Sequence, residues 1–487
     1  MMASNNTTRV AALVLVVVLV LIRSARADDT LWLSPRGTPE GRGTCLWPGG
    51  TPPPGIPEWH FTSKTNRRYR SGLAVWASPA VAVVGGRPMA FIGGYDQTMH
   101  ALDLAAKEQA WSKITNGEIA APPAVALVNG QQVVIWGSAD RTVYCHRAAD
   151  GARVWTRELV RATDTMSSAD LSAPLVYDGI VYVTCFAYDR ALARNDQKGW
   201  LFALDAADGA VRWQYEVSQG PVSSPAGRTL GGRFLVFVAA RKGLLQAIDA
   251  SAARPAPAWR FQMPHEVLGS PVVEEGTEKP LLFLGSKFGN LVALDAATGE
   301  ERWQHMAGNW IDNSASVGEV DGERVVFVGS YDYNVYALRA SDGEMLWRRR
   351  LGGEVYSAPG FFRMAGAPAV AVAALDNHLY VLDARDGSVV TSYYTGQPIW
   401  DKVSKGDTVW GSPVVLEAGA QTAVVHGSFN DTVFVLPLVG ECSVQAQVRS
   451  AASLWISLGV AAALFLGIVL PIVLWLPVRK GAGNSRL

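Results

Sequence analysis

Asn290–Trp303 reads NLVALDAATGEERW: an apolar run, then Asp295, a turn of small residues ending in Gly299, and a tryptophan. Apolar residues on both sides of a glycine turn predict a β-hairpin. Close copies of this stretch recur along the chain: WLFALDAADGAVRW at 200–213, NVYALRASDGEMLW at 334–347, TMHALDLAAKEQAW at 98–111 and TVYCHRAADGARVW at 142–155. Such recurrence is typical of a repeat architecture, so the repeat decides the fold.

The repeat occurs eight times. Its central apolar position falls at Leu102, His146, Leu204, Ile248, Leu294, Leu338, Leu382 and Leu436. Subtracting successive numbers gives steps of 44, 58, 44, 46, 44, 44 and 54 residues. Each unit holds four short apolar segments, the first of which usually follows a Ser-Pro or Ala-Pro step, and this predicts the four strands of a propeller blade. We therefore expect an all-β, eight-bladed β-propeller of four-stranded antiparallel blades over residues 57–444.

The hairpin tryptophans predict how the propeller closes. They stand at Trp59, Trp111, Trp155, Trp213, Trp259, Trp303 and Trp347, and the seventh unit has Thr391–Tyr394 in their place. The eighth unit has no tryptophan after Leu436, whereas Trp59 precedes the first unit. We expect the strand around Trp59 to supply the outer strand of the last blade, which removes an open sheet edge.

The repeated residues have structural roles in this scheme. A tryptophan can fill the gap between neighbouring blades. The aspartate of the Ala-Leu-Asp step can accept backbone N–H groups in the following turn. The glycine supplies the positive φ that the turn requires.

The composition and the two ends of the chain indicate the compartment and the membrane topology of the propeller. The chain of 487 residues has 43 basic and 43 acidic side chains, so it lacks the basic excess of a general nucleic-acid binder. Residues 1–27 resemble a cleaved secretory signal, with an uncleaved signal anchor as the alternative. Residues 28–56 form a Pro/Gly-rich arm. Residues 454–478 are apolar and uncharged, long enough for a transmembrane helix, and the basic tail at 479–487 predicts a cytosolic C-terminus. This topology is single-pass type I, with the propeller extracellular or in the lumen of the secretory pathway.

The four cysteines and one sequon belong to that oxidising compartment. Cys45 and Cys442 flank the predicted closing seam, and we expect a disulfide between them. Cys145 and Cys185 lie in successive units and are either bridged or buried as free thiols. Asn430 begins an Asn-Asp-Thr sequon, which is either glycosylated or only a hairpin turn.

The ALDAATGEERW repeat resembles the tryptophan-docking repeat of the pyrroloquinoline-quinone (PQQ)-like β-propeller family. The resemblance covers about residues 57–440. The family contains eight-bladed quinoprotein alcohol dehydrogenases and also relatives without catalytic activity, so the resemblance implies the fold and not an activity.

Catalytic signatures are missing from the sequence. The quinoprotein enzymes place an adjacent Cys-Cys pair against the quinone and hold Ca²⁺ with Glu, Asn and Asp, and neither pattern has a match here. The sequence also lacks H-E-x-x-H, G-x-S-x-G and P-loop motifs. We expect no catalytic residues and no cofactor, with PQQ and Ca²⁺ as the disfavoured alternative.

Acidic residues recur before the first strand of several units. Glu118, Glu266 and Glu354 each stand five residues before a proline of the first strand, and Asp170, Asp312 and Asp407 fall within one residue of that register. The longest irregular segments, Thr156–Ser168, Ala187–Lys198 and Thr395–Thr408, belong to the same predicted face. Loops on a rigid scaffold often carry binding residues. These six carboxylates are candidate ligand-binding residues around the channel mouth, or they only solvate its rim.

The sequence therefore favours a membrane-anchored propeller that binds a protein or small ligand on the face with the long loops, without catalysis and without nucleic acid. The alternative is a quinone- or metal-dependent oxidoreductase of the quinoprotein type. Arg161, Arg194, Lys402 and Lys405 are the basic residues that we expect to neutralise the acidic rim if the rim is only structural.

Overall fold

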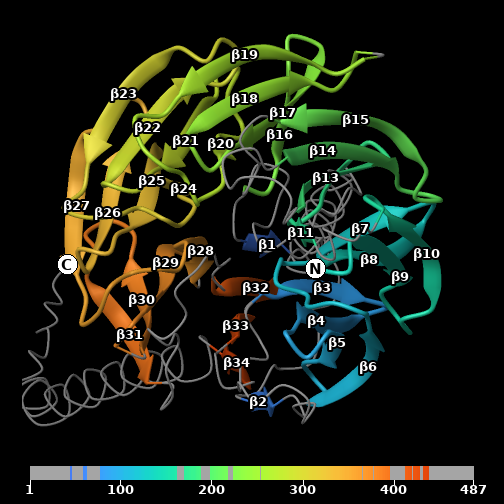
Figure 1. The fold of residues 1–487 in the computed structure, drawn as a ribbon. Coiled ribbons are helices and arrows are strands. Elements are labelled where there is room, and N and C mark those ends of the chain that lie inside the picture. The colour runs from blue at the N-terminus through green and yellow to red at the C-terminus, as the bar shows by residue number, and fades with distance from the viewer. Residues whose placement is uncertain are drawn as a thin grey trace, which may run out of the picture. The chain divides into compact units, whose positions relative to one another are not determined.

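In the computed structural model, the described part of the chain consists of strands, turns and loops (Figure 1). The described residues are 44–46, 59–62, 77–161, 169–187, 198–217, 223–252, 254–364, 366–376, 378–394, 412–418, 421–427 and 432–437. The chain divides into two units, Met1–Pro437 and Leu438–Leu487, and every described residue belongs to the first. None of the described residues forms a helix of the length and hydropathy needed to cross a membrane. The predicted signal peptide and transmembrane helix lie outside this described part.

Six blades are four-stranded antiparallel sheets of consecutive strands. The first two are β3 (Ala80–Val84), β4 (Arg87–Gly93), β5 (Thr98–Asp103), β6 (Glu108–Ile114), and β7 (Ala124–Val128), β8 (Gln131–Ser138), β9 (Thr142–Arg147), β10 (Arg153–Glu158). Two more are β16 (Ala226–Leu230), β17 (Arg233–Ala239), β18 (Leu244–Asp249), β19 (Ala256–Gln262), and β20 (Val272–Val273), β21 (Leu281–Gly285), β22 (Asn290–Asp295), β23 (Glu301–Met306). The last two are β24 (Ser316–Val320), β25 (Glu323–Gly329), β26 (Asn334–Arg339), β27 (Met345–Arg350), and β28 (Gly360–Met364), β29 (Ala367–Ala374), β30 (His378–Asp383), β31 (Val389–Tyr394).

A seventh blade, between β10 and β16 in the chain, has a divided inner strand. Its long strands are β13 (Ile180–Ala187), β14 (Lys198–Asp205) and β15 (Val211–Val217). Two short segments, β11 (Ala169–Leu171) and β12 (Leu175–Tyr177), pair antiparallel with different parts of β13. The predicted loops 156–168 and 187–198 are partly strand, because β10 continues to Glu158 and β14 begins at Lys198.

The eighth predicted unit differs from the others, and the prediction of eight four-stranded antiparallel blades is corrected here to seven blades of consecutive strands. Seven blades consist of consecutive strands, whereas the last repeat provides only β32 (Val414–Ala418), β33 (Gln421–Gly427) and β34 (Thr432–Pro437). These three join strands from the N-terminal part, β1 (Thr44–Leu46) and β2 (Trp59–Thr62), in the order β1-β32-β33-β34-β2. The physical reason is that β2 from the N-terminal part pairs with β34 at the place where the other blades have their own outer strand.

The N-terminal strand lies where the sequence predicts it. β2 pairs antiparallel with β34, with Trp59 opposite Val435. The sequence gives no signal for β1, which pairs parallel with β32 on the other side of the sheet and places Cys45 opposite Leu416. Cys442 lies outside the described residues, so the Cys45–Cys442 disulfide stays a prediction.

Serine hydroxyls link the inner strands of neighbouring blades. The backbone N–H of the residue before the first strand donates to the serine Oγ at the equivalent place in the next blade, at distances of 2.6–3.3 Å. The pairs are Ala173 to Ser224, Ser224 to Ser270, Ser270 to Ser314, Ala358 to Ser412 and Ser412 to Ser78. The last of these bonds joins residues 334 positions apart and connects the last repeat directly to the first blade.

Tryptophans dock five of the blades onto the next one, in the role that the sequence predicts. Five indole N–H groups donate to a backbone carbonyl of the following blade at 2.8–3.0 Å, namely Trp111 to Ala148, Trp155 to Ala206, Trp259 to Ala296, Trp303 to Ala340 and Trp347 to Ala384. The turn glycine of the following blade lies against the ring. A Cβ atom on Gly299, whose φ is +76°, would stand 2.6 Å from Trp259. This glycine is therefore required both by its backbone conformation and by the close approach of the ring.

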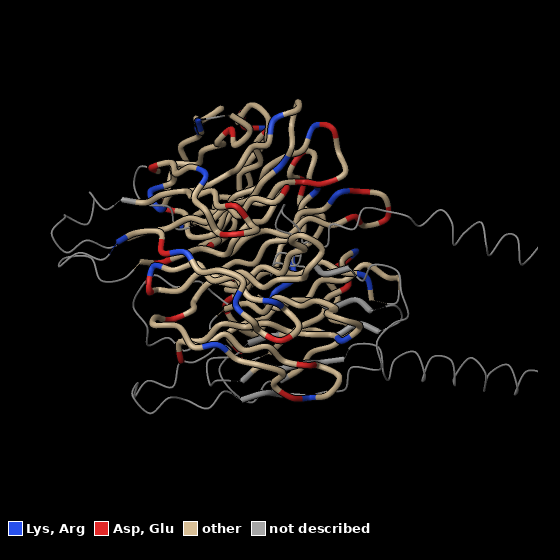
Figure 2. The backbone as a smooth tube through the Cα atoms, turned by 90° about the vertical axis from the view of Figure 1, so that its right-hand side faces the viewer, with Lys and Arg blue, Asp and Glu red and all other residues tan. Residues whose placement is uncertain are grey.

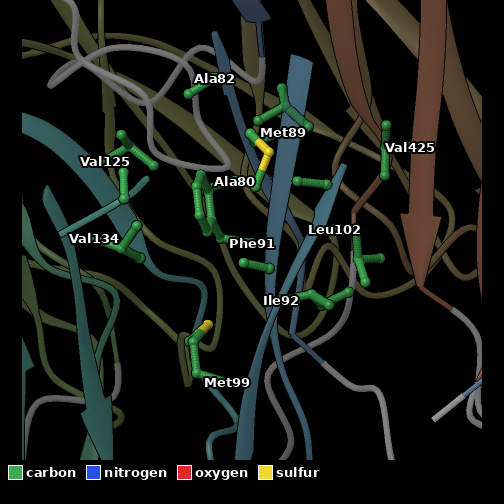
Figure 3. Packing of buried hydrophobic residues seen from close by; sticks show 14 of the residues in the cluster. Ala80, Ala82, Met89, Phe91, Ile92, Met99, Leu102, Val125, Val134 and Val425 are labelled. Carbon is green, nitrogen blue, oxygen red and sulfur yellow. The ribbon is translucent and has the colours of Figure 1, made fainter. Parts of the chain in front are cut away.

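The apolar core continues across the junction between the last repeat and the first blade. One cluster contains Phe91 and Leu102 of the first blade, Val125 of the second and Val425 of β33, all buried. Figure 3 shows Val425 on one side of the first-blade residues and Val125 and Val134 on the other. The first blade thus packs against both the second blade and the last repeat.

Candidate functional site

One face of the propeller, here called the loop face, carries the connections into each first strand and the turns between second and third strands. Two backbone hydrogen bonds clamp these segments together between blades. In the second blade the Glu118 carbonyl accepts from Ala139 N, and Ile119 N donates to Gly94 O of the preceding blade. The clamp fixes the rim residues of the loop face to rigid turns of two neighbouring blades.

The clamp defines which rim residues are equivalent. The carbonyls that accept from the turn between the second and third strands belong to Glu118, Glu266, Trp310 and Glu354. The three glutamates therefore share one structural position, as their spacing predicts. The placement of Asp312 is corrected, because Trp310 occupies the equivalent position and Asp312 stands two residues further along. The sixth repeat lacks the Ser-Pro step, so its sequence offers no proline from which to count the offset.

Glu118 and Asp170 form an acidic pair at neighbouring blades. Burial raises the pKa of the Glu118 carboxyl, and the negative charge of Asp170 raises it further. The same two carboxylates, after burial, raise the pKa of Tyr95 above its usual range. Two like charges held together in this way favour the approach of a cationic group.

Glu266 is neutralised by basic residues other than the four expected from the sequence. Its carboxylate lies 3.5 Å from Lys287 Nζ and 3.9 Å from Arg241 Nε. Both cations come from turns between second and third strands, which the clamp brings to the rim. Of the four expected partners, Arg161 is exposed at the edge of the described part, and Arg194, Lys402 and Lys405 lie outside it. Figure 2 shows basic and acidic positions interspersed along the backbone.

Asp312 and Glu354 belong to a buried chain of hydrogen bonds. Asp312 is only 4% exposed, and burial raises its pKa, although a hydrogen bond from Tyr331 and the charge of Lys287 act in the opposite sense. Tyr331 also hydrogen-bonds Tyr356, whose hydroxyl donates to Glu354 Oε2 at 2.9 Å. Tyr356 thus engages Glu354 within the protein, whereas Asp312 Oδ1 is buried without a hydrogen-bond partner among the described residues.

Aspartate turns account for most of the remaining acidic residues on this face. Asp96, Asp140, Asp332 and Asp376 each accept the N–H of the residue two positions on, and three of them also accept a tyrosine hydroxyl from the third strand. In two neighbouring blades the equivalent turn position holds Lys242 and Phe288 instead. Asp332–Asn334 is one of these aspartate turns.

Two of the four cysteines lie in the inner parts of described blades. Cys145 and Cys185 are buried free thiols, and burial raises the pKa of each to about 12. Within the described residues, no group of three or more His, Cys, Asp or Glu side chains is arranged to hold a metal ion. Asp407 and the Asn430 sequon lie outside the described residues.

The fold and its docking tryptophans define a β-propeller of the PQQ-like repeat class. Within that class, the chain belongs to the family described as outer membrane protein assembly factor BamB, whose model matches residues 51–233, 197–306 and 287–455. The structure of BamB from Moraxella catarrhalis is similar, with a TM-score of 0.53 and 17% identity over 78% of this chain and 100% of that one. Quinohemoprotein alcohol dehydrogenase from Comamonas testosteroni is also similar, with a TM-score of 0.58 and 13% identity over 79% of this chain and 76% of that one.

A sequence relative lies in a larger protein. The serine/threonine-protein kinase AfsK of Streptomyces griseus is 28% identical over 161 residues, which are 32% of this chain. The match spans 18% of the length of that kinase. The structural similarities lie below the identity at which more than the fold is shared, so activity has to be argued from the residues themselves.

Proposed function

We propose that this protein is a membrane-anchored propeller that binds a protein partner through its loop face and performs no catalysis. The proposed topology is single-pass type I, with a cleaved signal at 1–27, a membrane helix at 454–478 and the propeller outside the cytosol. Membership of the BamB family supports a protein partner, because the matching description is that of an assembly factor.

The observation that carries the proposal is the uneven charge of equivalent rim positions. Glu266 has two cations beside it, whereas burial and the negative charge of Asp170 both raise the pKa of Glu118. Two carboxylates that only solvate the rim would repel each other less if they stood further apart. A basic segment of a partner at Glu118 would relieve their repulsion.

The test compares two matched changes in the full chain purified in mild detergent. A lysine-rich synthetic peptide should bind the wild type and the Glu266→Gln variant with equal affinity. It should bind the double variant Glu118→Gln, Asp170→Asn roughly tenfold more weakly. Thermal unfolding of each variant reports folding. Equal binding to both variants would mean that the acidic pair has no role in recognition.

The alternative function is a quinoprotein-type oxidoreductase, favoured by the similar dehydrogenase structures. The residues do not fit a bound quinone. Cys145 and Cys185 are buried in one apolar cluster but belong to separate strands, and Cys45 lies in β1, so the described strands contain no adjacent cysteine pair. We propose that PQQ is not a cofactor. Stoichiometric binding of added PQQ with Ca²⁺, followed by alcohol-dependent reduction of a dye, would contradict this.

A further inference from the structure

The turn between β21 and β22 departs from the repeat in both chemistry and conformation. Where four other blades place an aspartate that hydrogen-bonds its own turn, this blade has Phe288 with a φ of +85° and a side chain that is 64% exposed. Positive φ is a marked outlier for a bulky residue, and such conformations concentrate at functional positions. The ring stacks on His265 with the ring centroids 4.3 Å apart and otherwise faces solvent. Glycine would adopt the positive φ of this position without strain.

Other exposed apolar side chains lie beside Phe288. Asn290 pairs with Met306, which is 60% exposed, and Gly289 O accepts from Ala307 N, so the end of β23 lies against this turn. Trp310, which takes the rim position of a glutamate, is 39% exposed. The Lys287 ammonium stands 5.0 Å from the Trp310 ring centroid and fixes the ring beside the turn.

Two arginines border this apolar area without a carboxylate partner among the described residues. Gly308 N donates to Asp332 Oδ2 at 2.8 Å and Arg350 Nη1 donates to the Asp332 carbonyl at 3.3 Å, which brings the end of β27 to the end of β23. The Arg350 guanidinium lies 4.8 Å from the Tyr333 ring centroid. Arg348 is on the same face of β27, two residues earlier, and both arginines are exposed.

Arginines at another position of the outer strand, directly before the repeat tryptophan, are neutralised in two other blades. Arg302 of β23 pairs with Asp295 at 2.7 Å, and Arg212 of β15 pairs with Asp205 at 2.7 Å. Asp332 accepts from Arg350 only through its backbone carbonyl, and its carboxylate is already engaged by Gly308 N, Asn334 N and Tyr336. The surface therefore presents positive charge beside apolar rings, and its electrostatic complement is acidic.

We infer that Phe288, Met306, Trp310, Arg348 and Arg350, together the Phe288 surface, bind an extended acidic peptide segment of the partner. One apolar side chain of the segment packs on Phe288 and Met306, and its carboxylates meet the two arginines. β27 is the last strand of its sheet, so its outer backbone groups can pair with an added strand. The inference rests on the proposed function, and it adds a second contact area on the loop face, distinct from Glu118 and Asp170.

The test uses fluorescein-labelled synthetic peptides and the full chain in mild detergent. The probe is rich in Glu and Asp with a single Phe, and the control peptides replace that Phe by Ser or the acids by Lys. The double variant Arg348→Gln, Arg350→Gln should bind the acidic probe at least about tenfold more weakly than the wild type. Phe288→Gly should weaken binding of the probe to the same extent, while its unfolding midpoint rises. Arg302→Gln, which removes a paired arginine on another blade, should bind like the wild type.

The outcomes separate this inference from the proposed function. If the double variant Glu118→Gln, Asp170→Asn no longer binds the lysine-rich peptide but binds the acidic probe as well as the wild type does, the proposed function and this inference are both supported. The inference is overturned if the acidic probe does not bind, or if the variants bind it as well as the wild type does. It is also overturned if the protein binds anionic phosphatidylserine vesicles and not the peptide. Each of these outcomes leaves the proposed function standing. A probe that binds as well with Ser as with Phe also overturns the apolar contact.

Discussion

Glu118 and Glu266 show how one backbone position acquires different chemistry in different blades. The same clamp holds both residues, but only Glu266 has Lys287 and Arg241 within ion-pair distance. A raised pKa in the folded state means that the folded protein takes up a proton at a higher pH than the unfolded chain does. The contribution of Glu118 to stability is therefore greatest below its ordinary pKa of 4.5 and falls as the pH rises from there towards its raised value.

We predict that Glu118→Gln raises the free energy of unfolding at neutral pH by about 0.5 kcal/mol, because a neutral amide is not repelled by Asp170. It should also reduce the loss of stability as the pH rises above the ordinary pKa of a glutamate. Urea unfolding at several pH values measures both effects. Glu266→Gln is the control and should lose a little stability, and a Glu118→Gln variant that is less stable than the wild type at neutral pH would contradict the prediction.

Phe288 supports a second prediction at the residue scale. Phe288→Gly should increase the free energy of unfolding by about 1 kcal/mol, because glycine adopts the observed φ of +85° without strain. Phe288→Ala is the matched control, since alanine keeps the strain and removes the same exposed ring. Calorimetry of the three proteins measures the difference, and equal midpoints for glycine and alanine would show that the turn relaxes.

Residue placement was predictable from the sequence wherever the repeat preserves its markers. The positions of Glu118, Glu266 and Glu354 follow from their offset to a proline, and the structure places them at one register. Trp310 was missed because its repeat lacks that proline. Lys287 and Arg241 were missed because they lie on turns of other segments, and only the clamp between blades brings them to Glu266.

At the scale of the elements, the hairpin carries most of the information about the fold. The register sets Trp303 opposite Ala293 and is followed by a bulge, and the same arrangement recurs at Trp347 opposite Ala337. A small residue opposite the ring leaves it free to reach the next blade, where Trp303 Nε1 donates to Ala340 O at 2.8 Å. Strands such as β1 and β11 carry no such marker, because each has three residues and takes its conformation from the strand it pairs with.

We predict that Trp303→Ala lowers the free energy of unfolding by roughly 3–5 kcal/mol, because the ring is 9% exposed and fills the space between two blades. Trp303→Phe retains most of the packing and should lose about 1 kcal/mol for the missing indole hydrogen bond. Urea unfolding followed by circular dichroism measures both changes.

Trp213 provides the control for this prediction. It occupies the same repeat position, but it is partly exposed and has no hydrogen bond to Ala250 in the described part of the chain. Trp213→Phe should therefore cost less than Trp303→Phe. Equal losses would show that the indole hydrogen bond contributes nothing beyond packing.

At the scale of the whole propeller, closure depends on segments from both ends of the repeat region. The sequence predicts the strand around Trp59 because the last repeat lacks an outer strand, and β2 pairs with β34 as expected. The same sequence gives no sign that β1 pairs parallel with β32, because its residues, TCL, have no alternating pattern and follow a glycine-rich segment. Contacts between distant segments of this kind depend on the assembled fold and cannot be inferred from local pattern.

Closure leads to the last prediction. Deletion of residues 57–62 from the full chain removes β2 and leaves the outer edge of β34 without its partner, and an unpaired edge strand promotes self-association. Amide hydrogen exchange in β34 should become roughly tenfold faster or more, and light scattering should detect oligomers. Deletion of residues 48–53 is the control, because it shortens the arm by the same length and retains both N-terminal strands. The bond from Ser412 N to Ser78 Oγ still links the last repeat to the first blade in the variant, so exchange in β3–β6 should change little. Unchanged exchange in β34 would mean that the serine link and the shared apolar core close the propeller without the N-terminal strand.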